Sequence, residues 1–141
     1  MFVAHGLWRV FMDPPCAYIS MKGAFNKEGI IAFQNDLMAT ASQFAPQSMM
    51  DAVVDLTEFE MSTADSIEDT RQYFAGVTQR GLQTVSYVGA NALARHMLEQ
   101  LWQDTTTAVH FFTSMEELVS NQPHYKGNID RLVKISFKHP N

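Results

Sequence analysis

The chain begins with two short segments whose hydrophobic patterns are typical of β-strands. Residues 7–12 (LWRVFM) are rich in aromatic and branched side chains, and residues 16–22 (CAYISMK) alternate between two faces. Asp13-Pro14-Pro15 separates the two segments and breaks the first. Two strands joined by so short a connection predict an antiparallel pair.

Helical periodicity dominates four later segments. Asn26 is a good N-cap for a helix over residues 27–44, in which apolar side chains recur on one face until Pro46 stops it. Ser62 or Thr63 caps a second helix, which ends near Arg80. The remaining helices are predicted over residues 90–103 and 115–121.

Short apolar segments lie between these helices and complete an α/β pattern. Residues 51–56 (DAVVDL) read as a buried strand followed by a loop over 57–61, and further strands are predicted at 84–88 and 109–112. Strands that alternate with single helices imply parallel pairing through right-handed crossovers. The predicted fold is therefore a mixed, mostly parallel sheet of about five strands with four helices and an antiparallel strand near one edge.

Composition narrows the class of protein. The 141 residues are 46% hydrophobic and only 18% charged, with 10 Lys and Arg against 15 Asp and Glu. This apolar content excludes intrinsic disorder, and the acidic balance argues against a nucleic-acid binder. The single cysteine, Cys16, excludes an intrachain disulfide and a Cys-rich zinc motif, and it is interpreted as a reduced, buried strand residue. With no run of about 20 apolar residues, the cytoplasm is the expected location.

The last 19 residues depart from the acidic pattern. We assign residues 1–122 to one domain and residues 123–141 to a basic C-terminal tail that packs on the domain or on a partner. The tail has four Lys and Arg residues against one acid, Asp130, and apolar residues alternate with the bases. Contact with an anionic membrane surface and addition of an extra strand remain open alternatives.

Several local sequences resemble those of a known family. The strand and turn Val53-Val54-Asp55-Leu56-Thr57-Glu58-Phe59 is followed by a helix ending Thr78-Gln79-Arg80-Gly81, and the segment 109–118 reads VHFFTSMEEL. Together with the strand at 84–88, these features resemble a STAS domain, the fold of anti-sigma-factor antagonists and of the cytoplasmic tails of sulfate transporters. The resemblance covers roughly residues 7–122, and it implies a bacterial regulatory module that binds a protein partner.

The sequence departs from this family at the phosphorylated position. Family members place Asp-Ser-Ser-Gly at the start of the helix after the Asp-containing strand, and here that stretch reads Thr63-Ala64-Asp65-Ser66. A shifted alignment offers Ser62, Thr63 or Ser66 as phosphoacceptor. The resemblance is therefore closer to a divergent STAS-like group, whose small bacterial members are thought to bind apolar ligands or associate with membranes.

An acidic cluster follows the Asp55 strand. It lacks the spacing and the glycine of a calcium loop, so it favours solvated charge or a protein-docking surface over a metal site. The residues expected to contact a partner are Glu58, Phe59, Met61, Ser62, Thr63, Asp65, Ser66, Glu68 and Asp69.

A second set of residues indicates an apolar ligand. Methionines and Phe59 lie in predicted loops rather than in helical stripes, and Gly89 begins a strand-to-helix turn that could present backbone N–H groups. The candidate ligand-binding residues are Met49, Met50, Phe59, Met61, Gly89 and Asn91.

The five histidines show no metal-ligand spacing, and no nucleophile–base arrangement can be assembled. We therefore predict a protein that is not an enzyme, with no cofactor and no metal, that binds a protein partner and lacks the serine phosphoswitch. The alternative is a carrier or sensor of a small apolar ligand or lipid with peripheral membrane contact. A homodimer remains open.

Overall fold

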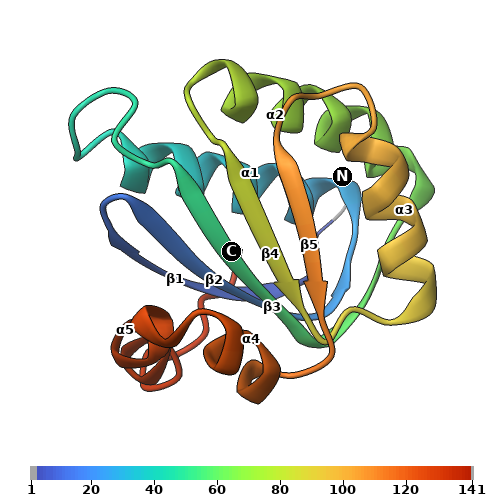
Figure 1. Ribbon diagram of the computed structural model, residues 1–141. Helices are drawn as coiled ribbons and strands as arrows, with labels where there is room; N and C mark the ends of the chain where they lie inside the picture. Colours follow the sequence, from blue (N-terminus) through green and yellow to red (C-terminus); the bar gives the residue numbers. More distant parts are fainter. Residues whose placement is uncertain (1–2, 141) are drawn as a thin grey trace.

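The computed structural model describes residues 3–140 and shows a five-stranded sheet with helices on both faces (Figure 1). The strand order along the sheet is β1-β2-β3-β4-β5, with β1 and β2 antiparallel and every other neighbouring pair parallel. The strands are β1 (Leu7–Asp13), β2 (Cys16–Phe25), β3 (Asp51–Ser62), β4 (Thr84–Val88) and β5 (Ala108–Phe112). The predicted mixed α/β sheet with an antiparallel edge strand is confirmed.

Three helices cover one face of this sheet, and two shorter helices lie on the other (Figure 1). The first three are α1 (Lys27–Ala41), α2 (Ile67–Gln79) and α3 (Ala92–Trp102). The other two are α4 (Met115–Asn121) and α5 (Lys126–Leu132). Single 3-10 turns over Ala64–Ser66 and Pro123–Tyr125 precede α2 and α5.

Alternation along the strands divides the core into two clusters. In β3, Ala52, Val54 and Leu56 face α1–α3, whereas Val53 packs with Tyr18 on the opposite face. A residue period of 2 sends successive side chains to opposite faces, so the continuous apolar sequence of β3 reflects burial on both sides. This three-layer arrangement explains why residues 52–54 of the strand are apolar on both faces.

Strand β3 is longer than the sequence analysis predicted. It continues through residues 57–61, which were expected to form a loop, and its last pair with β2 is Ser62 with Phe25. The reason is that β2 also runs on to Phe25 and supplies a partner for the extension. Glu58 and Glu60 alternate with Phe59 and Met61, which is the period of a half-buried strand.

The fifth helix, α5, was not among the four predicted helices. It has only seven residues, too few for an amphipathic stripe to show in sequence. Its Ile129 and Leu132 nevertheless belong to the buried cluster around Tyr18, and the Asn128 amide donates to the Tyr18 hydroxyl at 3.2 Å.

Beyond α5 the chain runs along β1. The Arg9 guanidinium donates to the Val133 and Ile135 carbonyl oxygens at 3.0 and 3.3 Å, and Lys138 forms one antiparallel bridge with Trp8. The bridge is isolated, so residues 133–140 add no sixth strand to the described sheet.

Basic side chains of this segment have partners within the same chain. Lys138 pairs with Asp36 at 3.0 Å, Lys126 pairs with Asp130 at 3.1 Å, and the Arg131 guanidinium lies 4.1 Å from the centre of the Phe11 ring. The Lys138 and Arg131 contacts hold these two bases against residues of the domain, whereas the Lys126 pair lies within α5.

We predict that truncating Leu132 destabilises the whole domain. Its side chain is 0% exposed, and removal of a buried leucine side chain costs about 2–5 kcal/mol. Leu132→Ala should therefore lower the free energy of unfolding in urea by about that amount. The matched control is Leu93→Ala, because Leu93 is 64% exposed and should change stability by less than about 0.5 kcal/mol. Equal stability of the two variants would show that α5 is not part of the folded core.

Candidate functional site

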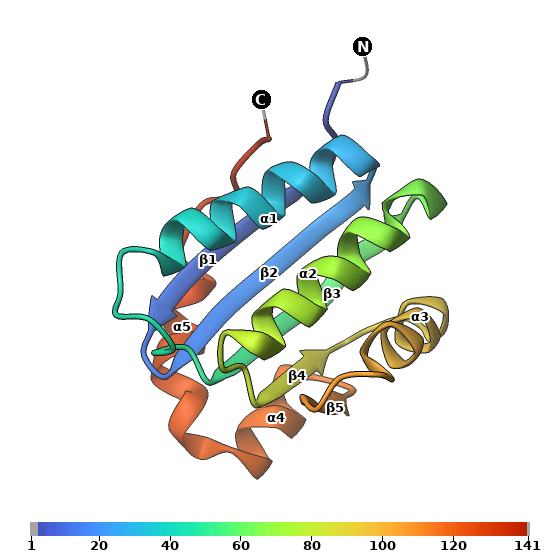
Figure 2. The ribbon, with the colours of Figure 1, turned by 90° about the horizontal axis from the view of Figure 1, so that it is seen from above.

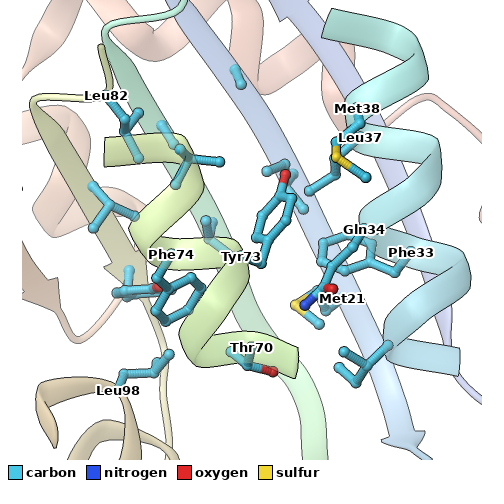
Figure 3. A pocket seen from close by; sticks show the side chains of 18 of the residues that line it. Met21, Phe33, Gln34, Leu37, Met38, Thr70, Tyr73, Phe74, Leu82 and Leu98 are labelled. Carbon is cyan, nitrogen blue, oxygen red and sulfur yellow. The ribbon is translucent and has the colours of Figure 1, made fainter. Parts of the chain in front are cut away.

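A cavity of about 680 Å³ lies on the sheet face that carries α1, α2 and α3. Its floor is formed by apolar side chains of β2, β3 and β4, and its walls by the three helices (Figure 3). The side chains that define its centre are Met21, Phe33, Leu37, Val54, Tyr73 and Phe74.

The cavity exists because α2 stands away from the sheet. None of the 13 residues of α2 is fully buried, although the helix lies over the middle of the sheet (Figure 2). By contrast α1 buries Ile30, Phe33 and Leu37. A helix over a sheet ordinarily buries its apolar stripe, so the half-buried stripe of α2 marks space beneath it.

On its α3 side, α2 is firmly held. The rings of Phe74 and Trp102 stack with centroids 3.9 Å apart and planes 11° apart. The Trp102 indole N–H in turn donates to the hydroxyl of Tyr87 in β4 at 2.8 Å. This chain of contacts fixes one edge of α2 to the sheet.

On its α1 side, α2 is linked to α1 by an ion pair near the amino-terminal ends of the two helices. There the Lys27 ammonium lies 3.7 Å from the Asp69 carboxylate. Further along, Tyr73 projects from α2 into the space between the helices, and Gln34 projects from α1 (Figure 3). Burial raises the pKa of Tyr73 to about 12, and the nearby Arg80 charge opposes that shift. The hydroxyl is therefore neutral at physiological pH.

The space is partly open to solvent and is lined mostly by apolar side chains. It is therefore filled by water or by another molecule, and water there would lie against a large apolar surface.

The structure places part of the predicted ligand set at this cavity. Met49, Phe59 and Met61 line it, and Met61 is 47% exposed where β3 ends. Met50 lies outside the lining, as do Gly89 and Asn91.

Gly89 and Asn91 have local structural contacts instead. A side chain at Gly89 would meet the Thr57 hydroxyl at 2.7 Å, and Gly89 has a φ of +70°. Asn91 caps α3 by accepting from the Ala94 N–H at 2.8 Å. These contacts tie the turn after β4 to β3 and to α3.

The predicted partner-binding residues follow the end of β3 and the start of α2. Exposed carboxylates here pair with neighbouring bases, Glu58 with Lys22 and Glu68 with Arg71, both at 3.7 Å. Because these pairs are exposed, each is worth at most about 1 kcal/mol and leaves the carboxylates available to a partner. Phe59, Met61 and Ser62 belong both to this surface and to the lining of the cavity.

The three phosphoacceptor candidates differ in accessibility. Ser62 is the last residue of β3, and the Thr63 hydroxyl donates to the Asp65 carboxylate at 2.6 Å. Ser66 is 0% exposed, and its hydroxyl donates to the Thr63 carbonyl oxygen at 2.7 Å. In this conformation the Ser66 hydroxyl is enclosed by the turn before α2.

Other reactive groups lie away from the cavity. Cys16 is buried on the opposite face of the sheet, near Tyr18 and Tyr125, and burial raises the pKa of its thiol to about 12. Within residues 3–140, no group of three or more His, Cys, Asp or Glu side chains is arranged to hold a metal ion. No helix in the same range has the length and hydropathy needed to cross a bilayer.

Sequence reasoning missed two polar residues of the cavity lining, Gln34 and Tyr73. A signal for Gln34 was present, because it follows Ile30 by four residues and therefore falls within the apolar stripe of α1. A polar residue at such a position is unusual enough to mark a site. Nothing comparable marked Tyr73, since a tyrosine beside Phe74 reads as ordinary core.

This architecture defines a SpoIIAA-like fold, the STAS-like class that the sequence motifs indicated. One similar solved structure is that of an uncharacterized protein of the DUF3478 family from Shewanella loihica PV-4, described as having a SpoIIAA-like fold. It shares 12% sequence identity, with a TM-score of 0.61 over 85% of this chain and 97% of that one. No family model matches the sequence, and no curated protein does. The likeness establishes the fold.

We predict that Cys16 is unreactive in the folded protein. With its pKa raised to about 12, the thiolate fraction at pH 8 is far below that of a free cysteine, and burial also blocks access. Modification by a disulfide reagent at pH 8 should be at least about 100-fold slower in the native protein than in urea. The native rate should rise with pH up to the raised pKa. A native rate close to the rate in urea would place the thiol at an accessible site.

Proposed function

We propose that this protein binds an elongated apolar small molecule or lipid in the cavity between α1 and α2, and that it catalyses no reaction on it. The observation that carries the proposal is a cavity of about 680 Å³ beneath a helix with no fully buried residue. A molecule in this space would give the stripe of α2 the apolar contact that the sheet does not provide.

The dimensions and the chemistry of the cavity support this function. Small-molecule sites in proteins span about 300–1,000 Å³ and combine apolar walls with a few polar groups. Covering apolar surface that water would otherwise wet contributes about 25 cal/mol per Å². Methionines at 12, 21, 38, 49, 61 and 97 line the space, and such flexible side chains adapt to ligands of different shape.

Binding without catalysis is supported by the kinds of side chain present. The charged groups in the lining are Glu60 and Arg80, and both are exposed at its edge. The cavity lining contains neither histidine nor cysteine, so it offers no nucleophile–base pair of the usual kind.

A protein partner is a second candidate, favoured by the surface beside the cavity. Met61 is 47% exposed there, and exposed carboxylates of Glu58, Glu60 and Glu68 surround the end of β3 and the start of α2. An apolar side chain bordered by charge is the usual composition of an interface. A basic partner would complement this charge.

We predict that a hydrophobic dye binds the cavity and that Ala41→Trp blocks it. Ala41 lines the cavity near the end of α1, so an indole there should occupy the space and weaken binding of N-phenyl-1-naphthylamine at least about 10-fold in a fluorescence titration. Native mass spectrometry of gently purified protein should also show a bound apolar molecule.

The matched control is Ala39→Trp, which places the same side chain on the exposed face of α1. It should bind the dye as the unmodified protein does. Equal weakening by both variants, or a complete lack of dye binding by the unmodified protein, would contradict the proposed cavity site.

For the second candidate, the test is a pull-down with the immobilised protein. We predict that the double variant Glu58→Lys and Glu68→Lys fails to capture a partner that the native protein captures. Reversal of two exposed charges should slow association with a basic surface by about 10-fold or more at low salt. Glu116→Lys, an exposed change on α4, should leave capture intact. Retention of every partner by the double variant would exclude this surface.

A further inference from the structure

We propose that the bound molecule carries a neutral oxygen-bearing group, a carbonyl or a hydroxyl, on an otherwise apolar frame. The Gln34 amide would hydrogen-bond to this group, and the Tyr73 hydroxyl would meet the molecule nearer Leu37 and Met38 (Figure 3). The inference rests on the proposed apolar-ligand function and names the chemical class that the cavity selects.

Gln34 is the first residue that indicates a polar group on the bound molecule. Its residue is only 9% exposed, and it lies on the inner face of α1 among Ile30, Phe33 and Leu37. Within residues 3–140 its amide makes no hydrogen bond, whereas every fully buried side-chain nitrogen or oxygen there has a partner. Its amide therefore stays in contact with the open space of the cavity, which it faces in Figure 3.

Leaving such a group without a partner is costly. An amide at the wall of an apolar space must find water or another polar group there, because an amide without any hydrogen bond loses at least the net contribution of that bond. Two hydroxyls of the lining donate to backbone acceptors: the Thr70 hydroxyl to the Ser66 carbonyl oxygen and the Ser42 hydroxyl to the Ala39 carbonyl oxygen.

Tyr73 supplies the second polar group from the opposite wall. Its ring enters the space between α1 and α2, with the hydroxyl reaching toward Leu37 and Met38 (Figure 3). The hydroxyl also makes no hydrogen bond within the described residues. The tyrosine of the neighbouring strand differs in this respect, because the Tyr87 hydroxyl accepts from Trp102.

The ligand group must be neutral because the cavity provides no counter-charge at this depth. Glu60 and Arg80 are the charged residues of the lining, and both lie at exposed positions. An ionised carboxylate beside Gln34 would lose its hydration without gaining an ion pair. An amide and a phenol each donate and accept, so they suit a ketone, an ester or an alcohol equally well.

The test compares three probes of similar length that differ only in polarity. Undecane, 2-decanone and decanoate compete with N-phenyl-1-naphthylamine on the full chain at pH 8. We expect 2-decanone to bind about 3- to 10-fold more tightly than undecane, as one or two hydrogen bonds would give, and decanoate to bind more weakly than the ketone.

Two variants test which side chains cause the preference for the ketone over undecane. Gln34→Met preserves the length of the side chain and should remove most of the advantage of the ketone over undecane. Tyr73→Phe should remove a smaller part. Gln43→Met is the matched control, because Gln43 is exposed near the end of α1 and does not line the cavity.

Thermal unfolding provides the readout that separates binding from folding. Gln34→Met removes an unpaired polar group, so the melting temperature of the unliganded variant should stay the same or rise. A ketone advantage that survives Gln34→Met, or equal binding of undecane and 2-decanone by the native chain, would overturn this inference alone. Tightest binding by decanoate would overturn it as well. If no probe displaced the dye and the dye itself did not bind, the proposed function would fall together with it.

Discussion

The parallel pairing of β2 with β3 is the interaction on which the rest of the structure depends. It runs from Cys16 beside Asp51 to Phe25 beside Ser62, well beyond the point where β4 ends beside Asp55. Because the crossovers that follow β2 and β3 are of the same hand, α1 and α2 must lie on the same face. The long pair thus provides both the floor of the cavity and the two helices that wall it.

The cavity then follows from an unequal attachment of α2. On one side the stack of Phe74 on Trp102, anchored through Tyr87, holds the helix in place. On the other side an exposed ion pair, Lys27 with Asp69, is a weak link. A helix held along one edge can move at the other with little loss of contact. Entry of a ligand between α1 and α2 therefore need not disturb the buried cluster beneath α4 and α5.

Most of the fold could be predicted from the sequence, whereas less of the candidate site could. Strand and helix periods predicted the five strands and the order of elements, because burial on a sheet or against it imposes those periods. The extension of β3 was missed because whether residues 57–61 pair depends on β2, which lies some forty positions away. A cavity is harder still, since Tyr73 in a packed core and Tyr73 over empty space have the same local sequence. Only Gln34, a polar residue in the apolar stripe of α1, marks the position of the cavity in the sequence.

The two candidate functions use some of the same surface residues, and this has a thermodynamic consequence. Phe59, Met61 and Ser62 line the cavity and also belong to the surface expected to meet a protein partner. A ligand that orders Met61 would change the surface offered to that partner, and a partner that covers Met61 would change access to the cavity. If both molecules bind, each must alter the affinity of the other by the same factor. Such coupling would act through the end of β3 and would need no phosphorylated serine.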